Sequence, residues 1–184
     1  MSPERPPLPT RTALVLTVSD RSFEGTRPDA SGERLAERLE ALGFEVERGV
    51  VPDEIPVIAQ ALADGAARHR LVISTGGTGL TPRDVTPQAT SQVLDYEIPG
   101  IAEAMRADGR RHTPFAVMSR GLVGVRGGSL IVNVPGSPKA ASESFDTLEP
   151  LLVHALETLA GPFDHGAERA AGRSDLPQGT LEER

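Results

Sequence analysis

The stretch Leu71-Val-Ile-Ser-Thr-Gly-Gly-Thr-Gly-Leu-Thr-Pro-Arg-Asp-Val-Thr-Pro-Gln-Ala-Thr90 decides which fold the rest of the chain is expected to take. Its apolar, β-branched start at 71–73 predicts a buried strand. The glycines that follow free the backbone to take positive φ and let a ligand come close. Thr86 and Pro87 have the residue types of a helix N-cap and first helical position, and a helix N-terminus favours anions. The stretch therefore predicts a strand, a phosphate-binding loop and a helix start in succession.

Two charged residues in this loop extend that interpretation. Arg83 supplies a fork of donors for an oxyanion, and Asp84 supplies a carboxylate that can hold a cation. The loop is not a Walker motif, because no Gly-Lys-Ser/Thr follows, and its glycines are wrongly spaced for a dinucleotide fingerprint. The spacing of these residues is equally compatible with a phosphate-binding loop and with an ordinary glycine-rich turn between a strand and a helix. The rest of the sequence is needed to distinguish the two.

Composition limits the possible classes of protein. With 184 residues, 38% of them hydrophobic, the chain suits one globular domain, and the absence of cysteine excludes disulfides and thiolate chemistry. A net charge of −7 with one Tyr and no Trp disfavours a nucleic-acid partner. No apolar run approaches the roughly 20 residues that span a bilayer. Because Met1 to Pro9 also lacks a signal-peptide core, we expect a cytoplasmic protein with no membrane partner.

Strand and helix patterns alternate along the chain. Strands are expected at 13–18, 44–51, 71–73 and 129–134, and helices are expected from Ser31 to 42, from 55 to about 69, from Thr86, from 100 to 109, from Pro138 to 148 and from 151 to 159. This order predicts an α/β fold, doubly wound, with a mostly parallel sheet, helices on both faces and a single compact domain. We expect a flexible N-terminal arm at 1–10, the α/β domain at 11–163 and a flexible C-terminal tail at 164–184.

Polar residues recur where the expected strands end. In a doubly wound sheet those loops lie along one rim, where ligands bind. Loops of this kind are always rich in Gly, Ser and Pro, which explains the glycines but explains less well an Arg or Lys recurring beside an Asp. The rim residues are Ser19, Arg21, Asp53, Thr75 to Asp84, Ser119, Arg120 and Gly136 to Lys139.

Several of these segments resemble the MogA/MoaB family of molybdenum cofactor biosynthesis. The central match is Thr75-Gly-Gly-Thr-Gly79 followed by Arg83-Asp84-Val-Thr-Pro87. The other matching segments, in order, are Ser19-Asp20-Arg21, Pro52-Asp53-Glu54, Glu97-Ile-Pro-Gly100 with Glu103 and Arg106, Ser119-Arg120, and Pro135-Gly-Ser-Pro-Lys139. The resemblance covers about residues 12 to 162.

The resemblance implies an activity. MogA-like members join AMP from ATP to the terminal phosphate of molybdopterin with Mg²⁺ and release pyrophosphate. The resemblance further implies a homotrimer and a downstream molybdate-inserting protein. Asp53 and Asp84 fall on the catalytic positions of the family and are expected to hold Mg²⁺. The substrate-binding candidates are drawn from the rim residues and are Ser19, Arg21, Thr75, Gly76, Gly77, Thr78, Gly79, Arg83, Ser119, Arg120, Gly136, Ser137 and Pro138.

Simpler roles remain open at this point. Asp53 could cap the helix that follows, Asp84 could be a solvated turn residue, and Arg120 could pair with a carboxylate. A non-catalytic molybdopterin carrier or scaffold of the MoaB type is an alternative to the enzyme, and a competence-damage-type domain acting on nucleotides is a third hypothesis. The four histidines, His69, His112, His154 and His165, show no metal-ligand spacing.

Overall fold

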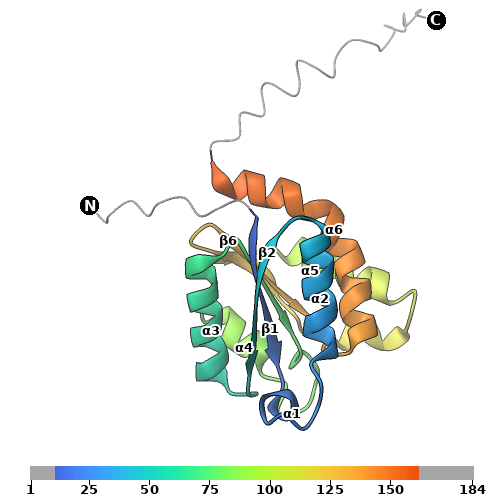
Figure 1. The fold of residues 1–184 in the computed structure, drawn as a ribbon. Helices are drawn as coiled ribbons and strands as arrows, with labels where there is room; N and C mark the ends of the chain where they lie inside the picture. Colours follow the sequence, from blue (N-terminus) through green and yellow to red (C-terminus); the bar gives the residue numbers. More distant parts are fainter. Residues whose placement is uncertain (1–10, 162–184) are drawn as a thin grey trace, which may run out of the picture.

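A six-stranded sheet in the order β2-β1-β3-β6-β5-β4 organises the chain in the computed structural model (Figure 1). The structure describes residues 11–161, so the expected arm at 1–10 and tail at 164–184 lie outside the described residues. Neighbouring strands among β2, β1, β3 and β6 are parallel, whereas β5 is antiparallel to β6 and β4 is antiparallel to β5. The expected mostly parallel sheet is confirmed. The strands are β1 Thr12–Val18, β2 Glu45–Val51, β3 Leu71–Thr75, β4 Tyr96–Glu97, β5 Val123–Arg126 and β6 Ser129–Val134.

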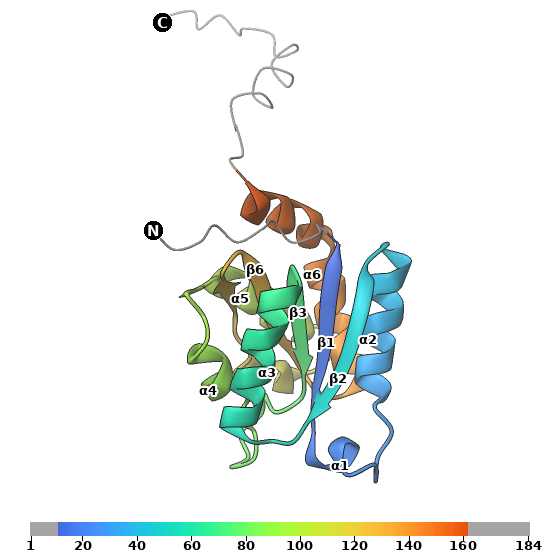
Figure 2. The ribbon, with the colours of Figure 1, turned by 60° about the vertical axis from the view of Figure 1, so that its left-hand side comes forward.

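Helices cover both faces of the sheet. In Figures 1 and 2, α3 and α4 lie on one face while α2 and α6 lie on the other. The helices are α1 Asp20–Phe23, α2 Ala30–Ala41, α3 Ile55–Arg68, α4 Thr86–Ser91, α5 Pro99–Gly109 and α6 Pro138–Ala160, with a 3₁₀ helix, η1, at Pro114–Met118. No helix in residues 11–161 is both long enough and apolar enough to cross a membrane.

Alternation along the strands builds two cores. In β1, Val15 packs in a cluster with Leu35 of α2 and Phe145 of α6, while Leu16 packs with Ile58 of α3 on the opposite face. Successive side chains of a strand point to opposite faces, so a continuous apolar run serves both layers. Full burial of each such side chain stabilises the fold by about 1.5–3 kcal/mol. The doubly wound fold is thereby confirmed.

One helix replaces two that were expected near the C-terminus. We predicted separate helices at 138–148 and 151–159, but α6 continues through Pro150. Proline removes a backbone donor and crowds the preceding turn, which kinks a helix, and Figure 1 shows a bend along α6. The helix persists because Leu148, Leu152 and Leu156, spaced four residues apart, are all buried against the sheet.

The structure also differs from the sequence analysis in one predicted cap and in elements that were not predicted. Helix α2 is capped by Asp29, whose Oδ1 accepts the amide of Gly32 at 2.9 Å, and not by Ser31, which lies inside the first turn. The apolar run at 116–118 belongs to η1. Strands β4 and β5 were not expected, because both are short.

Candidate functional site

The order of the strands creates a crevice at one end of the sheet. From β1 the chain crosses through α2 to β2 on one side, and from β2 it crosses through α3 to β3 on the other side of β1. Ligands of doubly wound sheets bind at such a switch point, beyond the carboxyl ends of the strands. Figure 2 shows β2, β1 and β3 side by side with α1 beyond the end of β1.

A polar cavity of about 450 Å³ lies at this crevice. The loops after all four parallel strands line it, together with the first residues of α2 and α6. It brings together eleven of the residues singled out from the sequence: Ser19, Arg21, Asp53, Thr75, Gly76, Gly77, Arg83, Asp84, Gly136, Ser137 and Pro138.

The glycine loop can approach β1 only because it lacks side chains. Gly76 has φ +105°, and a Cβ there would lie 2.2 Å from the carbonyl oxygen of Val18. Gly77 has φ +63°, and a Cβ there would lie 2.3 Å from Oγ1 of Thr86. Both positions therefore need glycine for backbone conformation and for space.

Thr86 holds this loop instead of capping α4. Its hydroxyl donates to the carbonyl of Gly76 at 2.8 Å, and its amide donates to the carbonyl of Gly77 at 3.0 Å. The N-cap position of α4 is Val85, which makes no side-chain capping bond. Thr86 is fully buried beside the folded-back loop. Its hydroxyl, which we expected to cap the helix, donates instead to the carbonyl of Gly76.

The loop after β6 presses against the glycine loop. A Cβ on Gly136 would lie 3.0 Å from Cα of Gly76, and the buried Thr75 hydroxyl donates to the carbonyl of Pro135 at 2.8 Å. Ser137 caps α6, its Oγ accepting the amide of Ala140 at 3.2 Å. The N-terminus of this 23-residue helix therefore opens on the polar cavity, where it favours an anion.

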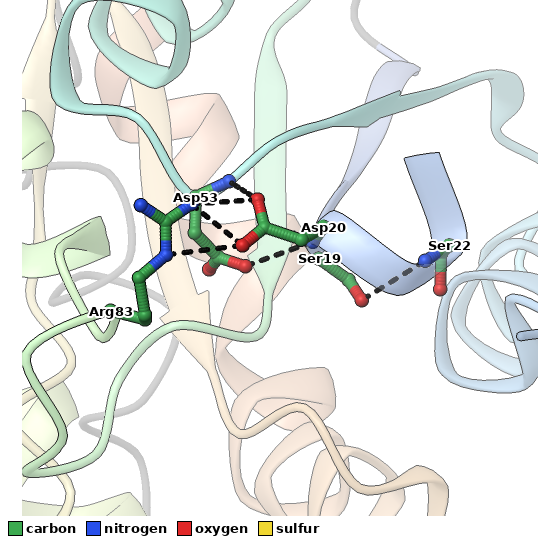
Figure 3. Close-up of polar contacts among 5 residues, drawn as sticks. All are labelled: Ser19, Asp20, Ser22, Asp53 and Arg83. Atoms are coloured by element: carbon green, nitrogen blue, oxygen red, sulfur yellow. Dashed lines mark hydrogen bonds and ion pairs between the residues drawn. The ribbon is translucent and has the colours of Figure 1, made fainter. Parts of the chain in front are cut away.

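At the rim, Asp20 and Asp53 each accept a hydrogen bond from the other's backbone amide, an arrangement that we call the clasp (Figure 3). The amide of Asp20 donates to Oδ2 of Asp53 at 2.9 Å, and the amide of Asp53 donates to Oδ1 of Asp20 at 2.9 Å. Arg83 joins them by donating from Nε and Nη2 to the carboxylate of Asp20. Asp20 stands in the sequence motif Ser19-Asp20-Arg21, but its side chain was not among the predicted site residues. Asp53 does not cap α3, whose N-cap position is Glu54.

The aspartates of the site differ in acidity. Burial raises the pKa of Asp53, and the nearby carboxylates of Asp20 and Asp84 add to this effect. Burial alone would also raise the pKa of Asp84, but hydrogen bonds from Thr81 and the backbone of Gly79 outweigh it and lower that pKa. The amide of Asp53, followed by Arg83, lowers the pKa of Asp20. Asp20 and Asp84 are therefore charged at neutral pH, and Asp53 is the carboxylate that gains most from a cation.

Asp84 combines a local role with a place in the cavity. Its Oδ2 accepts the amide of Thr81 at 2.8 Å, and its own amide donates to the carbonyl of Thr81 at 3.0 Å. The turn role left open by the sequence is confirmed, and the carboxylate also lines the polar cavity.

A second, apolar cavity of about 360 Å³ adjoins the far end of the same loop. Three sequence-predicted residues, Thr78, Gly79 and Ser119, line this apolar cavity and not the polar one. Most of its apolar wall was missed from the sequence because, apart from Leu80 of the loop itself, the residues come from distant elements. They are Ala102, Met105, Phe115, Ala116, Met118 and Ala140.

Arg120 lines neither cavity. Its Nε donates to the carbonyl of Gly79 at 2.8 Å and its Nη2 to the carbonyl of Asp84 at 2.5 Å. It therefore holds the loop between these two residues rather than pairing with a carboxylate.

Within residues 11–161, no group of three or more His, Asp or Glu side chains could hold a metal ion by itself. Mg²⁺, however, is usually held by one or two carboxylates plus waters and substrate phosphates. Asp53 and Asp84 line one cavity, and Oδ1 of Asp53 accepts no hydrogen bond from any described residue. The donor set therefore fits Mg²⁺ brought in with a polyphosphate, and does not fit a resident metal.

Comparisons with known proteins identify relatives of this chain. Residues 14–154 match the family described as "Probable molybdopterin binding domain". The molybdopterin adenylyltransferase of Haemophilus influenzae is 42% identical over 138 residues, covering 72% of this chain and 70% of that protein. The molybdenum cofactor synthesis protein cinnamon of Drosophila melanogaster is 40% identical over 149 residues, covering 79% of this chain but only 25% of that longer protein.

A solved structure shares the fold. The molybdopterin biosynthesis enzyme MoaB of Thermus thermophilus superposes with a TM-score of 0.77 at 48% sequence identity, covering 83% of this chain and 98% of that chain. The resemblance to MogA and MoaB proteins that the motifs carried is thereby confirmed. The chain belongs to the family of the probable molybdopterin binding domain.

Proposed function

We propose that this protein is a molybdopterin adenylyltransferase of molybdenum cofactor biosynthesis. It joins the AMP of ATP to the terminal phosphate of molybdopterin and releases pyrophosphate. The observation that carries the proposal is the convergence of Asp53, Arg83 and Asp84 with the glycine loop and the N-terminus of α6 on one polar cavity. The name of the Haemophilus influenzae relative, molybdopterin adenylyltransferase, supports it.

The reaction demands alignment and counter-charge more than proton transfer. An oxygen of the molybdopterin phosphate bonds to the α-phosphorus of ATP, and the bond from that phosphorus to the oxygen bridging to the β-phosphate breaks. The bonding electrons leave with pyrophosphate. The attacking phosphate is already anionic near neutral pH, so no general base is required, and the obstacle is the crowding of negative charge.

The rim supplies donors for those phosphates. The backbone N–H groups of Gly77 and Ser137 donate to no acceptor in the described part of the chain, and both residues line the polar cavity. Arg83, in the loop after β3, and Arg21, in α1, add positive charge at the polar cavity. These groups bind and orient the triphosphate of ATP against the molybdopterin phosphate.

Asp53 and Asp84 hold Mg²⁺ in this proposal. When bound, the ion neutralises phosphate charge in the cavity. The positive charge of the ion would also offset the free-energy cost of burying the charged Asp53 carboxylate, because burial by itself raises the pKa of Asp53.

The apolar cavity suits a flat heteroaromatic ring of one of the two substrates. It lies at Thr78 and Gly79, directly after the residues that line the polar cavity, so one ligand can place phosphates on one side of the loop and a ring on the other. Met105, Phe115 and Met118 provide the apolar and polarizable contacts that such rings favour.

An assay of product formation separates the candidate functions. The purified protein, incubated with molybdopterin, ATP and Mg²⁺, is expected to form adenylylated molybdopterin, and Asp84→Asn is expected to abolish it while keeping an oxygen acceptor for Thr81. The control Asp64→Asn changes an α3 residue whose carboxylate accepts an exposed hydrogen bond from Gln60 of the same helix, and it is expected to leave the rate unchanged. Molybdopterin binding without turnover would favour the carrier, and ATP hydrolysis without molybdopterin would favour the competence-damage-type hypothesis.

Two further parts of the proposal concern partners. The protein assembles as a homotrimer and passes its product to a molybdate-inserting protein. The exposed apolar side chains of Phe115 and Val117, 70% and 52% accessible in the single chain, support burial of this surface in an assembly. Light scattering of the protein in solution tests the trimer, and a monomer would contradict it.

A further inference from the structure

Among the described residues, only Asp20 has a side chain that bonds at once to the rim loop that carries Asp53 and to the rim loop that carries Arg83. These partners lie 33 and 63 positions away along the chain. Asp20 itself begins α1, at the end of β1. Figure 3 shows its carboxylate between the backbone of Asp53 and the guanidinium of Arg83.

The clasp with Asp53 fixes where the Asp20 carboxylate stands. Each residue accepts the other's amide, so the β1 and β2 loops are joined by two hydrogen bonds of 2.9 Å. An exposed aspartate without such a clasp would sample several rotamers. One oxygen of Asp20 is thereby committed to Asp53, and the carboxylate is presented to Arg83 in a single orientation.

Arg83 depends on that orientation. Its side chain is 60% exposed, and its contacts with Asp20 are Nε to Oδ2 at 3.1 Å, Nη2 to Oδ1 at 2.8 Å and Nη2 to Oδ2 at 2.6 Å. Its Nη1 group donates to no residue within 11–161. A forked contact of this kind sets the plane of the guanidinium and leaves Nη1 for a ligand at the cavity that Arg83 lines.

We infer that Asp20 is a positioning residue for adenylyl transfer, holding Arg83 ready to contact a phosphate of the nucleotide. This inference rests on the proposed function. Asp20 does not touch substrate in this scheme, and it acts through Arg83. The role requires a carboxylate, because an amide keeps one acceptor for Asp53 but lacks the second acceptor and the charge that orient the guanidinium.

A double-mutant cycle tests this role in the full-length protein. Asp20→Asn and Arg83→Gln are each expected to lower kcat/KM at least about tenfold, since small misplacements of catalytic groups are costly. The double variant is expected to be no slower than the slower single variant, because one contact is removed in all three. The KM for molybdopterin is expected to stay within about twofold, while kcat falls.

Asp146→Asn is the matched control, because it removes a carboxylate from another exposed arginine pair, with Arg38, that lines neither cavity. It is expected to leave the rate unchanged. If Asp20→Asn does not fold, Asp20→Ser, which keeps a short acceptor for Asp53, carries the same expectation. If the losses in kcat/KM of the two single variants add in the double variant, or if the Asp20 variant has the wild-type rate, this inference is wrong while the proposed function stands. A wild-type protein that forms no adenylylated molybdopterin would overturn the proposed function and the inference together.

Discussion

Arg120 holds the backbone of Asp84 by a hydrogen bond of 2.5 Å from its guanidinium to the aspartate carbonyl. The same guanidinium donates to the carbonyl of Gly79 at 2.8 Å, so both ends of the segment from Gly79 to Asp84 are hydrogen-bonded to one side chain. The position of the Asp84 carboxylate in the polar cavity therefore depends on a residue that lines neither cavity.

Arg120→Lys is expected to weaken this support, because an ammonium cannot reproduce the fork that reaches both carbonyls. The free energy of unfolding is expected to fall by about 2 kcal/mol, the scale of a hydrogen bond to a charged group, and adenylyl transfer is expected to slow at least about tenfold. Urea unfolding and the transfer assay measure the two effects. Arg110→Lys, at the exposed end of α5, is the control. Equal stability and rate for both variants would contradict this role.

Gly76→Ala is expected to be strongly destabilising. Its Cβ would enter the van der Waals radius of the Val18 carbonyl oxygen, 2.2 Å away, at a φ of +105°. Backbone strain alone is expected to cost about 1–3 kcal/mol, and the steric overlap adds to it. Gly100→Ala in α5 has open space and is expected to change the free energy of unfolding by less than about 0.5 kcal/mol. Comparable urea midpoints for the two variants would show that the loop does not need this glycine.

The strand and the glycine loop after it could be predicted from the sequence for a local reason. The β-branched run at 71–73 and the glycines after it are neighbours in the chain, and the structure extends that strand through Thr75 before the turn. The pairs Thr86-Pro87 and Ser137-Pro138 look alike in the sequence, yet only Ser137 caps its helix. Thr86 differs because the loop folds back and brings the carbonyl of Gly76, ten residues earlier, within reach of its hydroxyl. This is a tertiary contact, so the local sequence does not predict it.

Asp53→Asn is expected to change how stability depends on pH. Burial raises the pKa of Asp53 from its ordinary value of 3.8, so the native state binds its proton more readily than the unfolded chain does. The native protein therefore loses stability as pH rises from 3.8 through the raised pKa. The asparagine variant escapes this loss and keeps an acceptor for the amide of Asp20.

Thermal unfolding across this range measures the effect. The stability of Asp53→Asn relative to wild type is expected to be greater at neutral pH than below pH 3.8, by less than about 1 kcal/mol because the carboxylate is partly solvated. A relative stability that falls as pH rises would show that burial does not govern this carboxylate.

Nucleotide affinity is expected to depend on Mg²⁺ through Asp84. Removal of Mg²⁺ with a chelator is expected to weaken binding of a non-hydrolysable ATP analogue to the wild type at least about tenfold, or about 1.4 kcal/mol. In Asp84→Asn the same treatment is expected to change the affinity less than about threefold, because one of two carboxylates is gone. Equilibrium dialysis gives both affinities. An equal chelator effect in the two proteins would remove Asp84 from the metal site.

Features that the sequence did not predict come from contacts between distant segments. The clasp of Asp20 with Asp53 joins residues 33 positions apart and has no local pattern. Strand β5 was missed because Gly124 interrupts a run of four residues. The structure explains that glycine, since a Cβ there would lie 2.4 Å from the carbonyl oxygen of Tyr96 in the neighbouring strand β4. Short strands of this kind are set by their partners rather than by their own periodicity.

A crystal structure of the protein with Mg²⁺ and a non-hydrolysable ATP analogue tests the central claim most directly. The triphosphate is expected in the polar cavity, with oxygens at the amide of Gly77 and at Nη1 of Arg83, and with the metal ion between the carboxylates of Asp53 and Asp84. A triphosphate bound outside that cavity, or a metal ion that neither carboxylate touches, would contradict the account.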